Sequence, residues 1–369
     1  MSLKCLKSLL VAVFSISMCF YHNASFAQNA DTNQVTEQHN NTDPKEEEDF
    51  DVAASILDHI RDHHSWHLWG HTSIHLPVIL KTDKGFEAFS SSRLSDEHHQ
   101  PVVYNGNYPY KQIEGKIKVM NADGSINAEA SKKVFDISIT KNVVSMFITV
   151  FLLIFVFLGV ANAYKKTGVT SAPKGFQSFI EPIILFIRDE VAIPYLGARH
   201  VRFLPYLLTI FFFIWINNLL GLVPIFPGGA NVSGNIAFTL TLALFTFVIV
   251  NINGKKDYWK HIFWMPGLST GMKIFLMPIE ILGVFIKPIS LTIRLFANMT
   301  AGHILVLSLI SLVFIFKAVS ASAMAVPFTV FISVIELLVG FIQAFIFAML
   351  SALYIGMAIE EHHEQELVL

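Results

Sequence analysis

Long apolar stretches, separated by short charged segments, fill most of the chain after residue 140. A helix needs about 20 apolar residues to cross the hydrocarbon core of a bilayer. Five stretches meet that length, so the pattern predicts five membrane helices. They run from Val143 to Ala163, Phe203 to Leu222, Asn235 to Asn253, Lys273 to about Phe316, and Val326 to about Glu360.

The last two stretches are too long to stand upright in a membrane. At 1.5 Å per residue, the stretch that begins at Lys273 spans about 60 Å, twice the hydrocarbon thickness. Such a helix must tilt strongly, lie flat, or break at Pro278 and Pro288. We expect the last two helices to form a strongly tilted hairpin.

Basic residues gather in alternate connections, which sets the orientation. An excess of Lys and Arg marks the cytoplasmic side of a membrane protein. The basic residues are Lys165, Lys166, Lys174, Arg199, Arg202, Lys255, Lys256 and Lys260. The N-terminal region is therefore predicted to be exported, and the tail of residues 361–369 to be cytoplasmic. Apolar and charged residues alternate over 174–198, which predicts an amphipathic helix lying along the cytoplasmic membrane face.

The first 50 residues have the pattern of an export signal and a polar tail. Lys4 and Lys7 precede an apolar run, and Ser25-Phe26-Ala27 fits a small-x-small cleavage site. We interpret residues 1–27 as a signal peptide, with a retained anchor helix as the alternative. Residues 28–50 are polar and acidic, which predicts a disordered tail.

Residues 51–135 are predicted to form a small exported α+β region. Ile56 and Ile60 recur at helical spacing, together with His59, His63 and His67, so one short helix is expected. Apolar residues then alternate from Thr72 to Leu80, which is typical of a strand. Phe86–Phe89 and Val102–Tyr104 are further strand candidates, beside turns at Asp83-Lys-Gly85 and Asn105-Gly106.

The histidines of this region admit three interpretations. Imidazoles four residues apart on a helix can share a zinc ion. They can also collect protons at the mouth of a channel, because histidine titrates near neutral pH. We favour a third interpretation, an exposed polar face near the membrane. The histidines concerned are His59, His63, His67, His71, His75, His98 and His99.

Composition excludes several classes of protein. Hydrophobic residues make up 53% of the 369 residues, 33 of them Phe, which is typical of a multi-span membrane protein. The net charge of −2 argues against a nucleic-acid partner. Cleavage of the signal would remove both cysteines, Cys5 and Cys19, and with them thiol chemistry. Gly267-Leu-Ser-Thr-Gly271 has the wrong spacing for a phosphate loop, so we expect no nucleotide site of that kind. We also expect no cofactor and no metal.

Polar residues cluster inside the fourth apolar stretch. Arg294 lies at membrane depth, where a guanidinium costs about 2.5 to 3.5 kcal/mol by insertion scales, so it requires a polar partner or a function. Lys273, Glu280, Lys287 and Arg294 recur every seven residues and should form one polar stripe. Glu336 and Gln343 repeat that spacing in the fifth stretch.

The polar motif is Ser290-x-x-x-Arg294-Leu-x-x-Asn298-x-x-Ala-Gly-His303, with Glu336 and Gln343 downstream. Over about residues 135–360 the chain resembles subunit a of F-type ATP synthases. The resemblance implies a stator with two proton half-channels, in which Arg294 faces the carboxylates of a rotor ring of subunit c. Its other implied partners are the peripheral-stalk subunit b, the other ATP synthase subunits and membrane lipid, in a bacterial inner membrane.

The resemblance also assigns roles to the polar residues. It implies an outer half-channel of His303, Glu336, Asn298 and Gln343. Glu280 and Ser290 would belong to the inner half-channel, and Asn218 and Asn235 are candidates for a water path. The family often has a second polar residue two positions after Asn235, where this chain has Ala237.

Two other classes compete with this interpretation. A proton-coupled secondary transporter would also use an intramembrane Glu–Arg pair, but it should show inverted repeats and short broken helices, which the sequence lacks. An exported sensor would need only one membrane anchor, and the four additional polar-laced spans argue against it.

Overall fold

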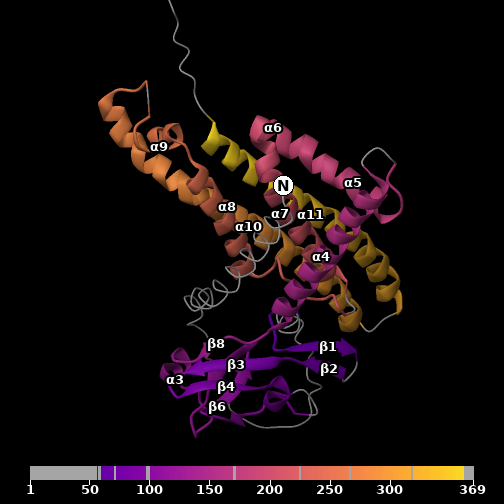
Figure 1. Ribbon diagram of the computed structural model, residues 1–369. Helices are drawn as coiled ribbons and strands as arrows, with labels where there is room; N and C mark the ends of the chain where they lie inside the picture. The colour runs from indigo at the N-terminus through magenta and orange to yellow at the C-terminus, as the bar shows by residue number, and fades with distance from the viewer. Residues whose placement is uncertain are drawn as a thin grey trace, which may run out of the picture.

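The computed structural model describes residue 56 and residues 60–69, 72–96, 100–168, 172–223, 226–265, 267–316 and 319–360. Within these ranges, a helical bundle stands at one end of the molecule and small antiparallel sheets at the other (Figure 1). The predicted signal peptide, acidic tail and cytoplasmic tail lie outside the described residues.

Five helical stretches among the described residues are long and apolar enough to cross a membrane, as predicted. They contain α4 (Lys141–Thr167), α7 (His200–Leu222), α8 (Ile236–Asn253), α10 (Thr270–Phe316) and α11 (Val319–Ile359). Their apolar composition and length make the chain a multi-pass membrane protein with an all-α membrane part.

Helix α10 continues through both of its prolines. It has 47 residues and contains Pro278 and Pro288 without an interruption in the helical assignment. Of the three geometries that its length allows, the structure therefore does not adopt a break at these prolines. The helix is about 70 Å long at 1.5 Å per residue, which still exceeds the hydrocarbon thickness. Helix α11, of 41 residues, begins at Val319, earlier than the predicted Val326.

The segment before α7 forms a run of short helices at the end of the bundle away from the sheets (Figure 1). It comprises α5 (Phe176–Ile187), a π-helical turn η3 (Arg188–Ala192), α6 (Ile193–Leu196) and a 3-10 turn η4 (Gly197–Arg199). Ile180, Ile187 and Val191 are buried against the bundle, whereas Glu190 is exposed. Helix α9 (Lys256–Phe263) lies at the same end.

The basic connections meet the C-terminal end of α11. Nη1 of Arg199 donates a hydrogen bond to the carbonyl of Ile359 at 3.0 Å, and the Lys255 N–H donates to the carbonyl of Ala358 at 3.0 Å. Residues 199, 255 and 359 thus lie at one end of the bundle, opposite the sheets. This arrangement gives the bundle one basic end and one end that faces the N-terminal region.

The core of the bundle combines aromatic rings with very small side chains. Phe341 of α11 packs edge-to-face against Phe211 and Trp215 of α7, with ring centroids 5.5 and 5.3 Å apart. Further along α11, Ala344, Ala348 and Ala352 are fully buried. Small residues of this kind allow close approach of helix backbones in membranes.

The N-terminal region contains three antiparallel sheets, β1-β2, β4-β3-β8 and β5-β6-β7. The elements are β1 (Ser65–Trp69), β2 (Thr72–His75), β3 (Pro77–Thr82), β4 (Gly85–Ser90), η2 (Ser91–Leu94), β5 (Tyr104–Asn105), β6 (Pro109–Ile113), β7 (Lys116–Val119), α3 (Ala128–Lys132) and β8 (Phe135–Asp136). Their apolar core includes Val78, Leu80, Leu94 and Tyr110. Burial raises the pKa of the Tyr110 hydroxyl, and Glu87 adds to the rise.

Two sequence predictions for this region are wrong. Ile56 and Ile60 are helical as predicted, but His63 lies outside any helix and His67 lies in strand β1, paired with Ser73, so the predicted helical face does not extend to these two histidines. The predicted strand from Thr72 to Leu80 is two strands in different sheets, divided at Leu76. Among the described residues, no group of three or more His, Cys, Asp or Glu could hold a metal ion. His59, His71, His98 and His99 lie outside those residues.

Candidate functional site

Arg294 lies on the uncovered face of α10. The opposite face of that helix is buried, with Leu291, Leu295 and Met299 almost fully inaccessible. Arg294 and Asn298 are exposed on a surface that also presents Ile293. Within the described part of the chain, no hydrogen bond or ion pair to the Arg294 guanidinium is found. The charged Arg294 side chain therefore lies on an apolar face of α10 that no other described part of this chain covers.

A buried imidazole–carboxylate pair lies further along α10. Nδ1 of His303 is 2.7 Å from Oε1 of Glu336 on α11, and the two side chains are only 12% and 5% exposed. Either the ring N–H donates to the carboxylate or a protonated carboxyl donates to the ring. In both cases the two groups share one proton across the interface between α10 and α11.

Glycines make room for this pair. A Cβ atom at Gly302 would lie 2.6 Å from Oε1 and 2.9 Å from Cδ of Glu336. A Cβ atom at Gly221 of α7 would lie 3.5 Å from Nε2 of His303 and 3.2 Å from the carbonyl of Ala230. Gly302 thus uses a close approach that a Cβ atom would prevent without a shift of Glu336, whereas Gly221 is only tightly packed.

Asn218 links three parts of the bundle near the pair. Its Nδ2 donates to the carbonyl of Gly340 at 3.0 Å, and its Oδ1 accepts a hydrogen bond from Oγ of Ser233 at 2.6 Å. Gly340 lies one turn after Glu336 on α11. The amide is buried, so both hydrogen bonds satisfy groups that water does not reach.

Asn235 has a local structural role. It is the N-cap of α8, and its Oδ1 accepts a hydrogen bond from the N–H of Ala237 at 2.9 Å. Asn235 thus bonds to the backbone N–H of residue 237, a contact that does not depend on which side chain that residue carries. Asn217, the neighbour of Asn218, accepts from Thr149 of α4 at 3.1 Å and ties α4 to α7.

The remaining predicted residues are more widely spread. Gln343 is buried on α11, but among the described residues no hydrogen bond joins Gln343 or Asn298 to Arg294. Glu280 and Ser290 lie, partly exposed, in the N-terminal half of α10. The structure therefore brings His303 and Glu336 together, with Asn218 close by, and leaves Glu280 and Ser290 apart from them.

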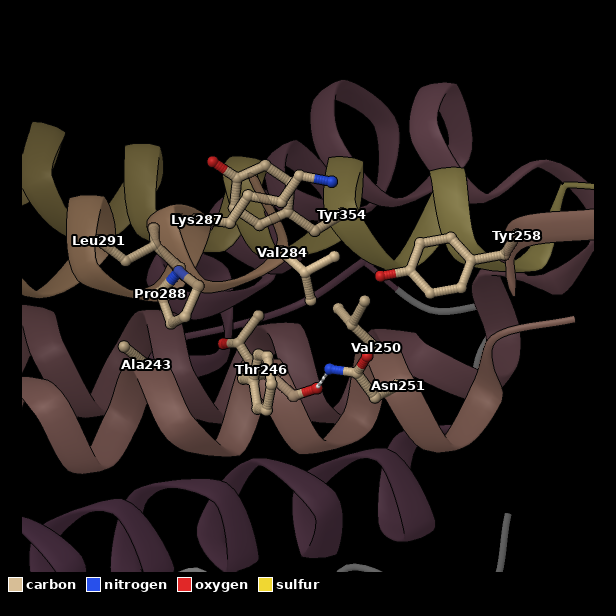
Figure 2. A pocket seen from close by; sticks show the side chains of 11 residues that line it. Ala243, Thr246, Val250, Asn251, Tyr258, Val284, Lys287, Pro288, Leu291 and Tyr354 are labelled. Carbon is tan, nitrogen blue, oxygen red and sulfur yellow. Dashed lines mark hydrogen bonds between the residues drawn. The ribbon is translucent and has the colours of Figure 1, made fainter. Parts of the chain in front are cut away.

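A cleft between α8, α9, α10 and α11 was not anticipated from the sequence. It is narrow, and the polar residues in its lining are Thr246, Asn251, Tyr258, Lys287 and Tyr354. Figure 2 shows Lys287 beside Tyr354, with its ammonium 5.4 Å from the ring centroid. The seven-residue stripe indicated Lys287, but nothing in the sequence linked that residue to α8 or to Tyr354.

A chain of hydroxyl groups continues from this cleft into the bundle. The Tyr206 hydroxyl is 2.7 Å from Oγ1 of Thr246, which is 3.1 Å from Oγ of Ser351. All three residues are buried, and they come from α7, α8 and α11. The chain of hydroxyls gives the bundle a second polar centre besides the His303–Glu336 pair.

These features define a class of protein. The chain is a multi-pass helical membrane protein that holds a buried imidazole–carboxylate pair and presents an arginine on an open apolar face. Intramembrane ionisable groups of this kind mark ion or proton pathways.

Comparisons with known proteins identify the family. Residues 143–356 match the family of the ATP synthase A chain, and residues 55–137 match a domain of unknown function, DUF8433. ATP synthase subunit a of Chlorobium phaeobacteroides (strain DSM 266) is 48% identical over 240 residues, which cover 63% of this chain and 69% of the relative.

Two further relatives are each named ATP synthase subunit a 2. The protein of Chlorobaculum tepidum is 48% identical over 230 residues, which cover 61% of this chain and 64% of the relative. That of Prosthecochloris aestuarii is 50% identical over 239 residues, which cover 63% and 72%. The chain belongs to the ATP synthase subunit a family, so the resemblance predicted from its polar motif is confirmed.

Proposed function

We propose that this chain is the proton-conducting stator subunit of a rotary ATP synthase, with two half-channels separated by Arg294. The observation that carries the proposal is the exposed guanidinium of Arg294 on an uncovered apolar face, on the helix that also holds one member of the buried His303–Glu336 pair. Along the helix axis, Arg294 and His303 are about 14 Å apart.

The uncovered face of α10 fits a rotor that carries carboxylates. An arginine exposed to lipid raises the free energy of the protein, because its charge is poorly solvated there. An ionised carboxylate that passes beside it offsets this cost. Arginine remains charged even when partly desolvated, because its guanidinium is a very weak acid, so it does not itself relay a proton. Arg294 thereby attracts each arriving carboxylate and blocks direct proton leakage between the half-channels.

The outer half-channel is proposed to run through the His303–Glu336 pair. A proton shared between an imidazole and a carboxylate can be accepted from one side and released to the other. Asn218 lies next to this pair through Gly340. Gln343 and Asn298 are proposed to continue the polar path from the pair toward Arg294. Asn235 contributes by capping α8 at the outer end.

The inner half-channel is proposed to include Glu280 and Ser290. Lys287 lies between them on α10 and interacts electrostatically with Glu280. The cleft that Lys287 and Tyr354 line lies on this side of Arg294 and is proposed to belong to the same half-channel (Figure 2).

The proposed setting is a bacterial inner membrane, with the N-terminal region periplasmic and the C-terminus cytoplasmic. The basic segments at residues 199 and 255, which meet the end of α11, support that orientation. The proposed partners are the rotor ring of subunit c, the peripheral-stalk subunit b and the other ATP synthase subunits.

The test compares Arg294→Ala and Arg294→Lys with the wild type in inverted membrane vesicles. ATP-driven acidification should be lost in Arg294→Ala and severely reduced in Arg294→Lys, while native gels show an intact complex. Lys273→Ala, on the same helix, is the matched control and should pump normally. Pumping by Arg294→Ala would overturn the proposal and favour a proton-coupled transporter.

A further inference from the structure

We propose that the N-terminal domain holds the outer half-channel in shape. In this proposal, Trp66 of strand β1 packs against residues 226–235, here called the outer loop, and thereby positions that loop beside His303. The outer loop joins α7 to α8, and neither family match assigns a function to the N-terminal domain. The inference builds on the proposed function, because it assigns the His303–Glu336 pair to the outer half-channel.

The side chain of Trp66 packs with the helical bundle rather than with the core of its own domain. Its ring is 5.2 Å from that of Phe226 in the outer loop, at an interplanar angle of 69°. It is only 3% exposed, and it joins the apolar cluster of the bundle, whereas Val78, Leu80 and Tyr110 form the separate core of the N-terminal domain. Trp66 thus inserts from one domain into the other.

The strand that carries Trp66 is anchored at the start of α4. The carbonyl of His63 accepts a hydrogen bond from the N–H of Lys141 at 2.9 Å, and Oδ1 of Asp62 accepts one from the N–H of Asn142 at 3.1 Å. These contacts satisfy donors in the first turn of α4, which have no partner within the helix.

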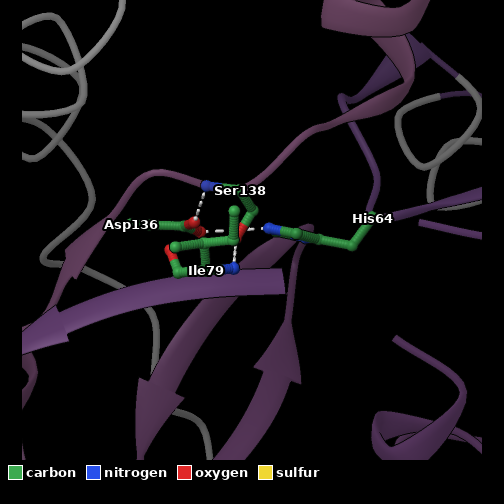
Figure 3. Close-up of polar contacts among 4 residues, drawn as sticks. All are labelled: His64, Ile79, Asp136 and Ser138. Carbon is green, nitrogen blue, oxygen red and sulfur yellow. Dashed lines mark hydrogen bonds and ion pairs between the residues drawn. The ribbon is translucent and has the colours of Figure 1, made fainter. Parts of the chain in front are cut away.

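A second set of contacts joins this strand to the end of the domain. Figure 3 shows Nε2 of His64 pointing at Asp136, with Oδ2 at 3.0 Å. The other carboxylate oxygen of Asp136 accepts from the N–H of Ser138 at 2.9 Å, and Oγ of Ser138 accepts from the N–H of Ile79 at 3.0 Å. His64 is buried, so the base of strand β1 is fixed from both sides.

The outer loop transmits this position to the proton path. Ala230, Val232 and Ser233 are buried, and the N–H of Gly229 donates to the carbonyl of Leu220 at 3.1 Å. Ser233 holds Asn218 through the 2.6 Å hydrogen bond. The Ala230 carbonyl and His303 Nε2 lie against the same point of α7, at Gly221. A loop displacement therefore changes the surroundings of both Asn218 and His303.

Trp66 is accordingly a positioning residue that acts through the outer loop. It lies at the inter-domain contact and touches no member of the imidazole–carboxylate pair. Loss of its ring should loosen the outer loop first and slow proton uptake from outside as a consequence. A purely structural role within the N-terminal domain would instead loosen strand β3 and leave the outer loop protected.

The test is hydrogen exchange on the purified intact complex. In Trp66→Ala, the exchange rate of the Gly234 and Asn235 amides should rise about tenfold, which is the factor expected when one aromatic ring contact is lost. Trp66→Phe should restore most of the protection. Phe86→Ala removes another aromatic ring of the same domain, one that is 70% exposed, and it should leave the outer loop unchanged.

Phe226→Ala provides a second variant that leaves the N-terminal domain intact. It removes the other ring of the contact and should expose the same loop amides, even if Trp66→Ala destabilises the domain. Loop protection equal to wild type in Phe226→Ala would overturn the inference. This readout does not depend on proton conduction. If the Trp66 and Phe226 variants lose loop protection but Arg294→Ala still pumps, the contact between Trp66 and the outer loop is supported and the proposed function is rejected.

Discussion

The space at Gly302 provides a direct test of the imidazole–carboxylate pair. Gly302→Ala adds one methyl group, which would lie 2.6 Å from Oε1 and 3.2 Å from Cγ of Glu336. The carboxylate must retreat by several tenths of an ångström or more. Because the hydrogen bond to His303 is only 2.7 Å long, that retreat weakens or breaks it.

The expected magnitude follows from two opposing effects. A hydrogen bond to a charged group contributes about 1.5 to 3 kcal/mol. Its loss therefore lowers the equilibrium constant for the paired arrangement of His303 and Glu336 by roughly tenfold to a hundredfold. Alanine in a helix is about 1 kcal/mol more favourable than glycine. The fold should therefore survive the change, while proton uptake through the pair should fall by about tenfold or more.

The assay is passive proton flux through the membrane sector, with ATP-driven acidification measured alongside. Gly159→Ala is the matched control, because Gly159 lies in α4 with nothing within 4 Å of an added Cβ. It gains the same helix propensity and should leave flux unchanged. Adding Glu336→Asp to Gly302→Ala shortens the carboxylate side chain and should recover part of the flux.

A normal flux in Gly302→Ala would refute this reasoning, provided that the complex assembles. It would mean that the 2.7 Å contact is not required for proton uptake, and that Glu336 acts without His303. A loss of flux shared equally by Gly159→Ala would point to helix packing instead.

Two other predictions concern the carboxylates. Glu336→Gln keeps a hydrogen-bonding group at the pair but removes its acidity, so flux from outside should fall severalfold while native gels show normal assembly; unchanged flux would count against the assigned role. Desolvation raises the pKa of Asp136, but hydrogen bonds from His64 and Ser138 hold it below its usual value. The unfolded chain then binds the proton more readily, so the contribution of Asp136 to stability is complete above about pH 4 and is lost as the pH falls through the lower folded pKa. Asp136→Asn should flatten that acid dependence, measured as exchange of β3 amides in the intact complex, and an unaltered acid profile would contradict this origin.

The membrane helices were predictable because lipid imposes a length on them. An unpaired backbone group is too costly in hydrocarbon, so a long apolar run has few alternatives to a helix. The polar motif around Arg294 likewise stands out, since charge is rare at that depth. These constraints act on each segment by itself and are therefore visible in the sequence.

Contacts between distant segments were not predictable in the same way. The spacing of His63 and His67 is typical of a helix, but pairing of β1 with β2 overrides it. The alternating run that includes Leu76 is divided because the N–H of Leu76 donates to the carbonyl of His64 and to Oγ of Ser91. The hydrogen bond from Asn218 ends on a backbone carbonyl, which leaves no trace in residue type.

The row of alanines on α11 has a consequence for how the last helix finds its register. Ala344, Ala348 and Ala352 repeat every four residues, so a shift of α11 by one turn would present nearly the same small surface to the helices around it. Van der Waals packing alone thus distinguishes poorly between neighbouring registers.

Specific polar contacts remove that ambiguity. Glu336 reaches His303, the carbonyl of Gly340 accepts from Asn218, Ser351 lies beside Thr246, and the carbonyl of Ile359 accepts from Arg199. A shift of one turn would break all four contacts at once. His303, Glu336 and Asn218, which are proposed to serve proton movement, therefore also fix the register of α11 during assembly. The same contacts are needed for proton transfer and for correct insertion of the last helix.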